Sequence, residues 1–191
     1  MKKVLIGLGV LVVLFILFIW WGSTVETPDV DNSGVGDNTT QSDNQNFTSD
    51  KGNFSIYFEG TPIYTSGTLS LSTGETYATH LYQYKAADES VWQAFYTEYP
   101  AKVDISNPEN VLLNTIKGTE GAVQGKIVST KTGVYQDLPS IDYVISIPQQ
   151  KYFLKGRNII QGHKLYSVSY IYDEGKEVSS QSFFDSLKIQ K

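Results

Sequence analysis

The most apolar part of the chain is its beginning, where residues 4–21 read VLIGLGVLVVLFILFIWW and carry no charge. A helix of that length rises about 27 Å, which is close to the hydrocarbon thickness of a bilayer. Lys2 and Lys3 precede the run, and no further Lys or Arg follows until Lys51. The positive-inside rule then predicts a cytoplasmic N-terminus and an extracytoplasmic remainder. We therefore expect a single-pass transmembrane signal anchor at residues 1–22.

A cleaved secretory signal is the alternative interpretation of this run. Such a signal normally has an apolar core of about 7–15 residues, followed by small residues at the cleavage site. The core here is longer, and the sequence WWGSTVE at 20–26 lacks a small-residue cleavage pattern. The absence of cysteine also excludes the lipid-modified cysteine of a bacterial lipoprotein. The uncleaved anchor is the interpretation that these features favour.

Polar residues dominate residues 23–50, which contain six acidic side chains and no basic one. A segment with so few large apolar side chains cannot bury enough surface to offset the entropy of ordering it. We expect a disordered acidic linker between the membrane and the folded domain. The pattern from Asp29 to Gly34 resembles half of a calcium loop, but Thr40 stands where a bidentate glutamate belongs. The sequence therefore does not favour a calcium site there.

From residue 51 to residue 191 the apolar pattern is typical of one folded domain. The sequence Asn107-Pro108-Glu109 predicts a helix start, because it combines a capping side chain, proline at the first helical position and an acid in the first turn. A second helix is expected at 173–186, and a turn at 137–140. Strands are expected from period-two alternation and aromatic content at 54–58, 63–72, 75–85, 91–99, 126–134, 141–147, 151–160 and 164–172.

Short links between the predicted strands favour antiparallel pairing. The predicted fold class is α+β: a mainly antiparallel sheet flanked by helices, an α-β-α sandwich, preceded by one transmembrane helix. Apolar side chains on both faces of 91–99 predict a central strand covered on both sides.

Composition narrows the chemistry further. The chain has no cysteine, which excludes disulfides, thiolate metal sites and cysteine nucleophiles. The net charge of −5 belongs to the linker, because the domain has thirteen basic and fourteen acidic residues. A nucleic-acid interface needs a basic surface, so nucleic acid is not an expected partner.

Several short segments of the domain together resemble the PsbP-like superfamily. The resemblance covers roughly residues 50–191. It implies an antiparallel sheet between helices and a non-catalytic module, of a kind that in bacteria is often anchored outside the cytoplasmic membrane. A photosystem role is not implied, because no manganese- or calcium-related residue can be matched. The segments that carry the resemblance are 54–62, 91–100, 138–140, 162–166 and 183–189.

Candidate catalytic groups are few. His80 and His163 are the only histidines, and neither has a second histidine at ligand spacing, so no metal and no cofactor is expected. No phosphate-binding glycine loop, nucleophile elbow or zinc-protease helix is present. Carboxylates that the fold could bring together for hydrolysis are Asp137, Asp142, Glu98 and Glu120. Solvated acids at strand ends are the alternative interpretation.

Thirteen tyrosines are the one marked excess in composition. Because tyrosine combines a large contact area with a polar tip, a row of tyrosines can form a binding face. The same row can also be the packed face of a sheet under a helix. The candidate binding face consists of Tyr82, Tyr84, Tyr166, Tyr170 and Tyr172.

The sequence thus predicts a non-enzymatic binding or adaptor module, tethered to the cell membrane with its C-terminal domain extracytoplasmic. The expected partner is an envelope protein. Two alternatives stay open at this point: a carrier or sensor of a small apolar ligand or lipid, and a hydrolase with a dispersed carboxylate site.

Overall fold

The computed structural model describes residues 39–41, 46–70, 75–176 and 180–190. Within these ranges no helix combines the length and the apolar character needed to cross a bilayer. The predicted anchor at residues 1–22 lies outside the described residues, as does most of the predicted linker.

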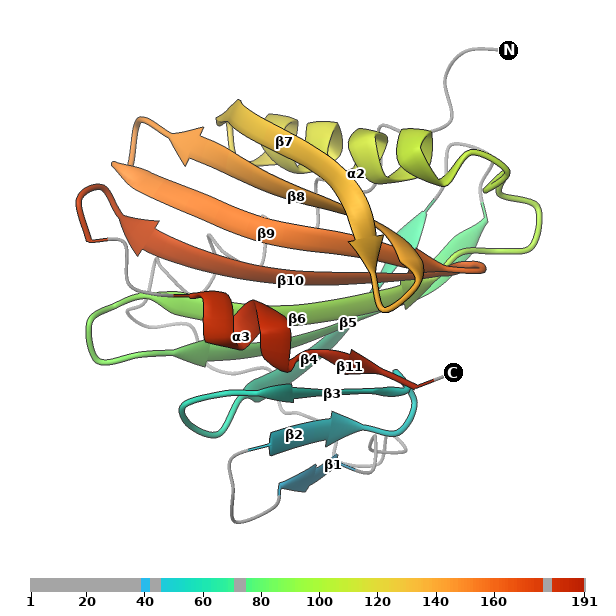
Figure 1. Cartoon of the computed structure of the whole chain (residues 1–191), viewed down its shortest axis with the longest axis horizontal. Coiled ribbons are helices and arrows are strands. Elements are labelled where there is room, and N and C mark those ends of the chain that lie inside the picture. Colours follow the sequence, from blue (N-terminus) through green and yellow to red (C-terminus); the bar gives the residue numbers. More distant parts are fainter. Residues whose placement is uncertain (1–38, 42–45, 71–74, 177–179, 191) are drawn as a thin grey trace.

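A seven-stranded antiparallel sheet forms the centre of the molecule, in the order β4-β5-β6-β10-β9-β8-β7 (Figure 1). The predicted antiparallel sheet is therefore confirmed. Its strands are β4 (Ile63–Ser70), β5 (Thr76–Lys85), β6 (Val91–Glu98), β7 (Lys126–Tyr135), β8 (Leu138–Ile147), β9 (Tyr152–Gln161) and β10 (Lys164–Asp173).

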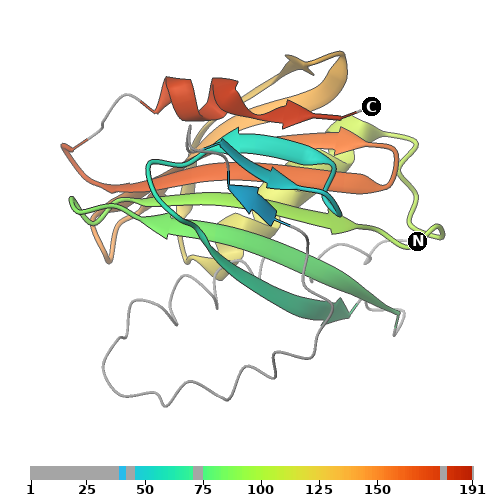
Figure 2. The same ribbon diagram turned by 90° about the horizontal axis from the view of Figure 1, so that it is seen from below.

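A four-stranded antiparallel sheet packs against one face of the large sheet. Its order is β1-β2-β3-β11, so it joins strands from the two ends of the described chain. Figure 2 shows β11 following α3 and lying beside β3. Its strands and the helix that leads into it are β1 (Thr39–Gln41), β2 (Asn46–Ser49), β3 (Phe54–Tyr57), α3 (Gln181–Ser186) and β11 (Lys188–Ile189).

Helix α2 (Pro108–Ala122) covers the other face of the large sheet. The side chain of Asn107 accepts a hydrogen bond from the backbone N–H of Asn110 at 3.1 Å, so the predicted cap is confirmed. Apolar and threonine side chains of α2 are buried against the sheet, among them Leu112 and Ile116. Glu120 then accepts a bond from the backbone N–H of Ile127 at 2.7 Å, which fixes the helix end to the start of β7.

The large sheet therefore separates two cores. One core lies between the sheet and α2 and includes Ile145, Leu154 and Leu165. The other lies between the sheet and the small sheet with α3, and it is mainly aromatic. Strand β6 contributes to both cores, because Phe95 faces α2 while Trp92 faces α3. A central strand covered on both sides is what its sequence predicts.

The predicted α-β-α sandwich needs a correction, since most of the second layer is a sheet. Residues 46–49, assigned to the disordered linker at 23–50, form β2 and bury Phe47 and Ser49. The hydroxyl of Ser49 lies 3.0 Å from that of Tyr82, and the ring of Phe47 lies 4.4 Å from the Tyr82 ring. The ordered chain thus starts earlier than predicted, because these residues pack on the large sheet although their neighbours are polar.

The C-terminal helix is also shorter than the predicted 173–186. Strand β10 continues to Asp173, and Gly175 adopts a φ of +84°, which favours glycine and ends the strand in a turn. Helix α3 begins only at Gln181, and residues 177–179 are not described. The expected turn at 137–140 is confined to Gln136 and Asp137, since β8 already starts at Leu138.

Gly156 illustrates how closely β8 and β9 are packed. A Cβ atom at this position would lie 2.4 Å from the Tyr143 ring. The two residues are register partners on adjacent strands, and Tyr143 is buried. Burial raises the pKa of Tyr143 to about 12, in spite of a hydrogen bond with Ser167. A side chain at Gly156 would therefore force this ring out of its site.

We predict that Gly156→Ala destabilises the fold by about 1–3 kcal/mol, the usual cost of overpacking. Gly121→Ala is the matched control, because nothing lies within 4 Å of its added Cβ and the residue is helical. The control should stabilise the protein by about 1 kcal/mol through helix propensity. Urea unfolding measures both; equal effects of the two substitutions would contradict the close approach at Gly156.

Candidate functional site

The tyrosines of the candidate binding face lie mostly in the aromatic core. Tyr82, Tyr166, Tyr170 and Tyr172 are buried, and Tyr84 is half-buried. Tyr166 donates a hydrogen bond to the backbone carbonyl of a glycine in the β2–β3 turn at 2.9 Å. The structure places these side chains between the two sheets. As a binding face, the set stays a prediction.

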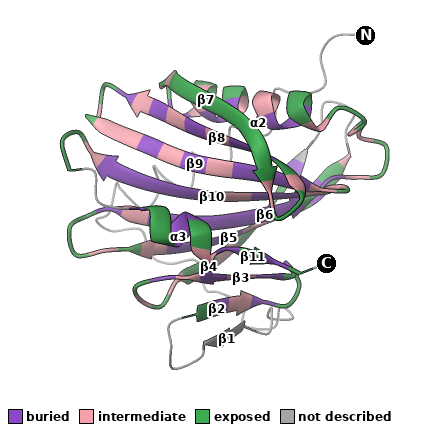
Figure 3. Ribbon diagram, viewed as in Figure 1, coloured by how far each residue is buried: buried purple, intermediate pink, exposed green. Residues whose placement is uncertain are grey.

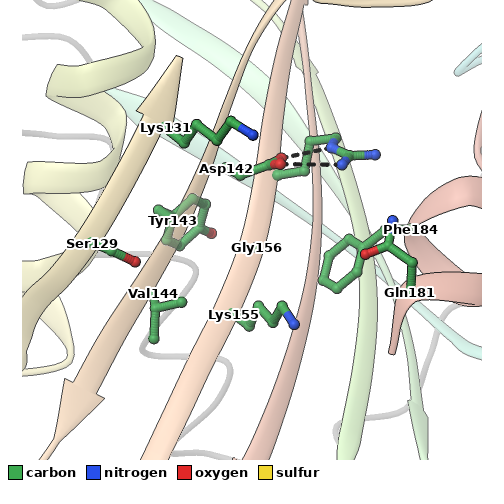
Figure 4. A pocket seen from close by; sticks show the side chains of 10 residues that line it. Ser129, Lys131, Asp142, Tyr143, Val144, Lys155, Gly156, Gln181 and Phe184 are labelled. Atoms are coloured by element: carbon green, nitrogen blue, oxygen red, sulfur yellow. Dashed lines mark hydrogen bonds and ion pairs between the residues drawn. The ribbon is translucent and has the colours of Figure 1, made fainter. Parts of the chain in front are cut away.

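A shallow pocket of about 100 Å³ opens at the surface where β7, β8 and β9 pass α3 (Figure 4). Strands β7, β8 and β9 supply most of its wall, and α3 closes one side with a glutamine and a phenylalanine. The residues that line it are Ser129, Lys131, Asp142, Tyr143, Val144, Lys155, Gly156, Arg157, Gln181 and Phe184.

Strand register explains why charged side chains gather at this pocket. Asp142 on β8 is paired with Lys131 on β7 and with Arg157 on β9, so the three form one row across the sheet. Val144 pairs with Ser129 and with Lys155 in the same way, which makes a second row two residues along. Because side chains alternate between the faces of a strand, both rows project to the same side.

Arg157 and Asp142 form a bidentate ion pair at the wall of the pocket. The guanidinium donates from Nε to Oδ1 at 2.6 Å and from Nη2 to Oδ2 at 3.2 Å. Only 13% of the Arg157 side chain is exposed. The charge also lies 4.6 Å from the centre of the Tyr135 ring and 5.9 Å from that of Phe184. The two parallel hydrogen bonds and the two rings define the orientation of the guanidinium, so Arg157 forms part of the pocket wall.

The hairpin that joins β7 to β8 holds the α3–β11 corner in place beside the pocket. The hydroxyl of Tyr135 donates to the backbone carbonyls of Leu187 at 2.7 Å and Phe184 at 3.1 Å. A tyrosine hydroxyl is a donor at neutral pH, and burial raises the pKa of this one further. Gln136 donates to the same Leu187 carbonyl at 2.6 Å and accepts from the backbone N–H of Ile189 at 3.0 Å.

The pocket is basic. Lys131, Lys155 and Arg157 contribute three positive charges, whereas Asp142 is the only carboxylate in the lining. That carboxylate is occupied by Arg157. Figure 4 shows the side chains of Lys131 and Lys155 on the strands that form the pocket wall. Asp185 of α3, outside the lining, is a second carboxylate near Arg157, with its Oδ1 3.8 Å from Nη1. The two lysines of the lining favour a negatively charged group in the pocket.

The other candidate carboxylates lie elsewhere. Glu120 is bonded to the backbone of Ile127, and Asp137 lies in the β7–β8 turn with a φ of +66°. Glu98 ends β6 and is exposed. Of the four acids predicted for hydrolysis, the pocket thus includes Asp142 alone.

Neither histidine lines this pocket. His80 stacks on Tyr96, with ring centres 4.4 Å apart, and its Nδ1 lies 2.8 Å from the Tyr64 hydroxyl. The backbone carbonyl of His163 accepts a hydrogen bond from the backbone N–H of Tyr99 at 2.8 Å. Across the described ranges, no three His, Asp or Glu side chains are grouped closely enough to hold a metal ion.

Sequence reasoning singled out Asp142 at this site and missed Lys131, Lys155 and Arg157. A signal for two of them was present. Lys155 and Arg157 alternate with Leu154 and Gly156 along β9, so one face of an inner strand carries two cations in succession. Such a face is normally apolar when it is covered, and the cations therefore indicate an open surface.

Comparisons with known proteins support the fold. No protein-family model matches the chain, and no curated protein matches it. The structure is similar to the solution structure of cyanobacterial PsbP (CyanoP) from Synechocystis sp. PCC 6803, with a TM-score of 0.51 and 11% sequence identity. The match covers 88% of this chain and 98% of the cyanobacterial chain. The described domain therefore has a PsbP-like fold, as its sequence segments predict.

Proposed function

We propose that this protein is a non-catalytic binding module that docks a protein partner at the cell envelope through the basic pocket. The pocket carries this proposal, because its lining adds Lys131 and Lys155 to an Arg157 whose charge already faces Asp142 and Asp185. An acidic side chain of a partner would gain charge-assisted hydrogen bonds there. The likeness in fold to cyanobacterial PsbP is compatible with an accessory role of this kind.

The size of the pocket favours a protein partner over a small-molecule ligand. Pockets for small molecules usually measure about 300–1,000 Å³ and enclose most of the ligand. The pocket at α3 measures about 100 Å³, which is room for one side chain. The aromatic core beneath the small sheet is filled by its own rings, including Tyr82, Tyr170 and Trp92. A carrier of an apolar molecule would need a space that these residues fill.

Membrane attachment is the second part of the proposal. The apolar run at residues 4–21 would anchor the chain, with Lys2 and Lys3 on the cytoplasmic side. The partner would then be a protein exposed at the outer face of the same membrane.

A cysteine-labelling experiment tests this orientation cleanly, because the natural chain contains no cysteine. Lys117 is exposed on α2, so we expect Lys117→Cys to react with a membrane-impermeant maleimide on intact cells. Lys3→Cys should react only after the cells are lysed. Recovery of the protein in the soluble fraction, or the opposite labelling pattern, would contradict the anchored orientation.

Crosslinking in membranes tests partner binding through the pocket. We expect affinity purification of the full chain after crosslinking to recover the same companion in repeated experiments. Lys155→Glu should reduce that recovery several-fold, because it places a negative charge in the pocket. Lys117→Glu has the same change in net charge on α2 and should have no effect.

Two results would contradict the proposal that the protein binds a partner through the pocket. One is the absence of any reproducible companion. The other is undiminished capture by Lys155→Glu, which would place the contact away from the pocket.

A further inference from the structure

We propose that the outer edge of β7 binds an extended, acidic segment of the partner protein as an added β-strand. This inference rests on the proposed function and specifies how the partner is held. The added strand would lie beside Lys131, at the rim of the basic pocket. Backbone hydrogen bonds would supply most of the affinity, and the lysine would select for acidic side chains.

Strand β7 is the last strand of the large sheet on this side. Among the described residues, β8 is the one strand that pairs with it. Figure 3 shows β7 exposed along nearly its whole length, and eight of its ten residues are exposed. Val128 and Val134 expose 59% and 74% of their surface. A long, exposed edge strand with apolar side chains is a template for pairing with another chain.

The β7–β8 turn determines which backbone groups point outward. Gln136 and Asp137 have φ values of +52° and +66°, as in the two-residue turns that close antiparallel hairpins. In such hairpins the flanking residues, here Tyr135 and Leu138, exchange hydrogen bonds with each other. The next pair then makes no hydrogen bond across the hairpin. This next pair is Val134 and Pro139. Because Pro139 has no N–H to donate, its place in a pair without hydrogen bonds agrees with this assignment.

Hydrogen-bonded and non-hydrogen-bonded pairs alternate from this turn along the hairpin, which determines the direction of the backbone groups in the rest of β7. Gly133 and Lys131 belong to hydrogen-bonded pairs with β8, so their backbone groups point inward. Val134, Thr132 and Thr130 belong to the intervening pairs, so their N–H and C=O groups point away from β8. The free edge thus offers three consecutive donor–acceptor positions to an incoming strand.

Only part of β7 is protected against such pairing. A β-bulge between Ile127 and Ser129 distorts the start of the strand, and bulges block regular pairing. From Ser129 to Tyr135 the register with β8 is regular, and no proline interrupts it. The regular stretch contains a single charge, that of Lys131.

Charge favours an acidic partner over a second copy of this chain. Residues 126–136 contain two lysines and no acid. Lys155 and Arg157 lie on the same side of the sheet as Lys131, on the strand beyond β8. Antiparallel pairing of two β7 edges would bring two copies of Lys131 close together across the interface, and like charges there are destabilising. An acidic strand would meet the same lysine favourably.

The test uses the full chain in detergent micelles and two capped peptides of about nine residues, a typical strand length. Valine alternates with glutamate in one peptide and with lysine in the other. Amide hydrogen exchange should show new protection at Thr130, Thr132 and Val134 with the glutamate peptide and none with the lysine peptide. Equal protection by both peptides would overturn the proposal. Protection that appears without peptide when the protein concentration is raised would also overturn it, because it would indicate pairing between two copies of this chain.

Substitutions separate the backbone contribution from the charge. Thr132→Pro removes one outward N–H while leaving the bonds to β8, so it should abolish peptide binding. Thr132→Val keeps that N–H and is the control. Lys131→Glu should weaken binding about tenfold, since it replaces an attraction by a repulsion, whereas Lys117→Glu should have no effect. Circular dichroism and urea unfolding establish that each variant is folded.

These outcomes can be told apart from failure of the proposed function. If folded Thr132→Pro binds the glutamate peptide as tightly as the natural chain, strand addition at β7 is wrong. A companion that is still captured from membranes in a Lys155-dependent manner would then leave the binding module itself in place.

Discussion

Each face of the seven-stranded sheet carries a large apolar area, and each of these areas needs a cover that excludes water. Burial of this apolar surface is the main favourable term in folding, so the rest of the structure depends on how the two faces are covered. Helix α2 covers one face. The other face is covered by a small sheet that pairs β3 with β11, which brings the beginning and the end of the described chain together. In a chain without cysteine, this pairing and the packing beneath it hold the termini of the domain.

The extent of that second cover determines where the surface is open. The α3–β11 corner is fixed by Tyr135 and Gln136 from the tip of the β7–β8 hairpin. Along β7, β8 and β9 beyond α3, the sheet surface is left as the basic pocket. Asp142 and Arg157 form an ion pair at its wall, whereas Lys131 and Lys155 add two positive charges to its lining. The same feature that closes the core thus leaves β7 as an exposed edge next to a cationic surface.

Much of the fold follows from local sequence patterns. The cap at Asn107, the alternation at 141–147 and the apolar faces of 91–99 all predict what the structure has. Strand β2 was missed because Phe47 is the only large apolar residue among polar neighbours, and its partners Tyr82 and Phe54 come later in the chain. Strand β11 has two residues, which is too short for any periodic signal.

The candidate site could not be predicted in the same way. Its members Lys131, Asp142 and Arg157 are combined by the register of three strands, which local patterns do not determine. The excess of tyrosine drew attention to side chains that the structure uses mainly for packing. Fold similarity to cyanobacterial PsbP gives no residue-level correspondence at 11% identity, so the site depends on its own geometry.

Hydrogen exchange of the unliganded full chain tests the central claim most directly, since it reports whether β7 is a free edge. The geometry predicts slow exchange at Lys131 and Gly133, which are bonded to β8, and fast exchange at Thr130, Thr132 and Val134. Uniformly slow exchange along β7 would show that the edge is already occupied. That result would contradict the account of β7 as the open docking edge of a binding module.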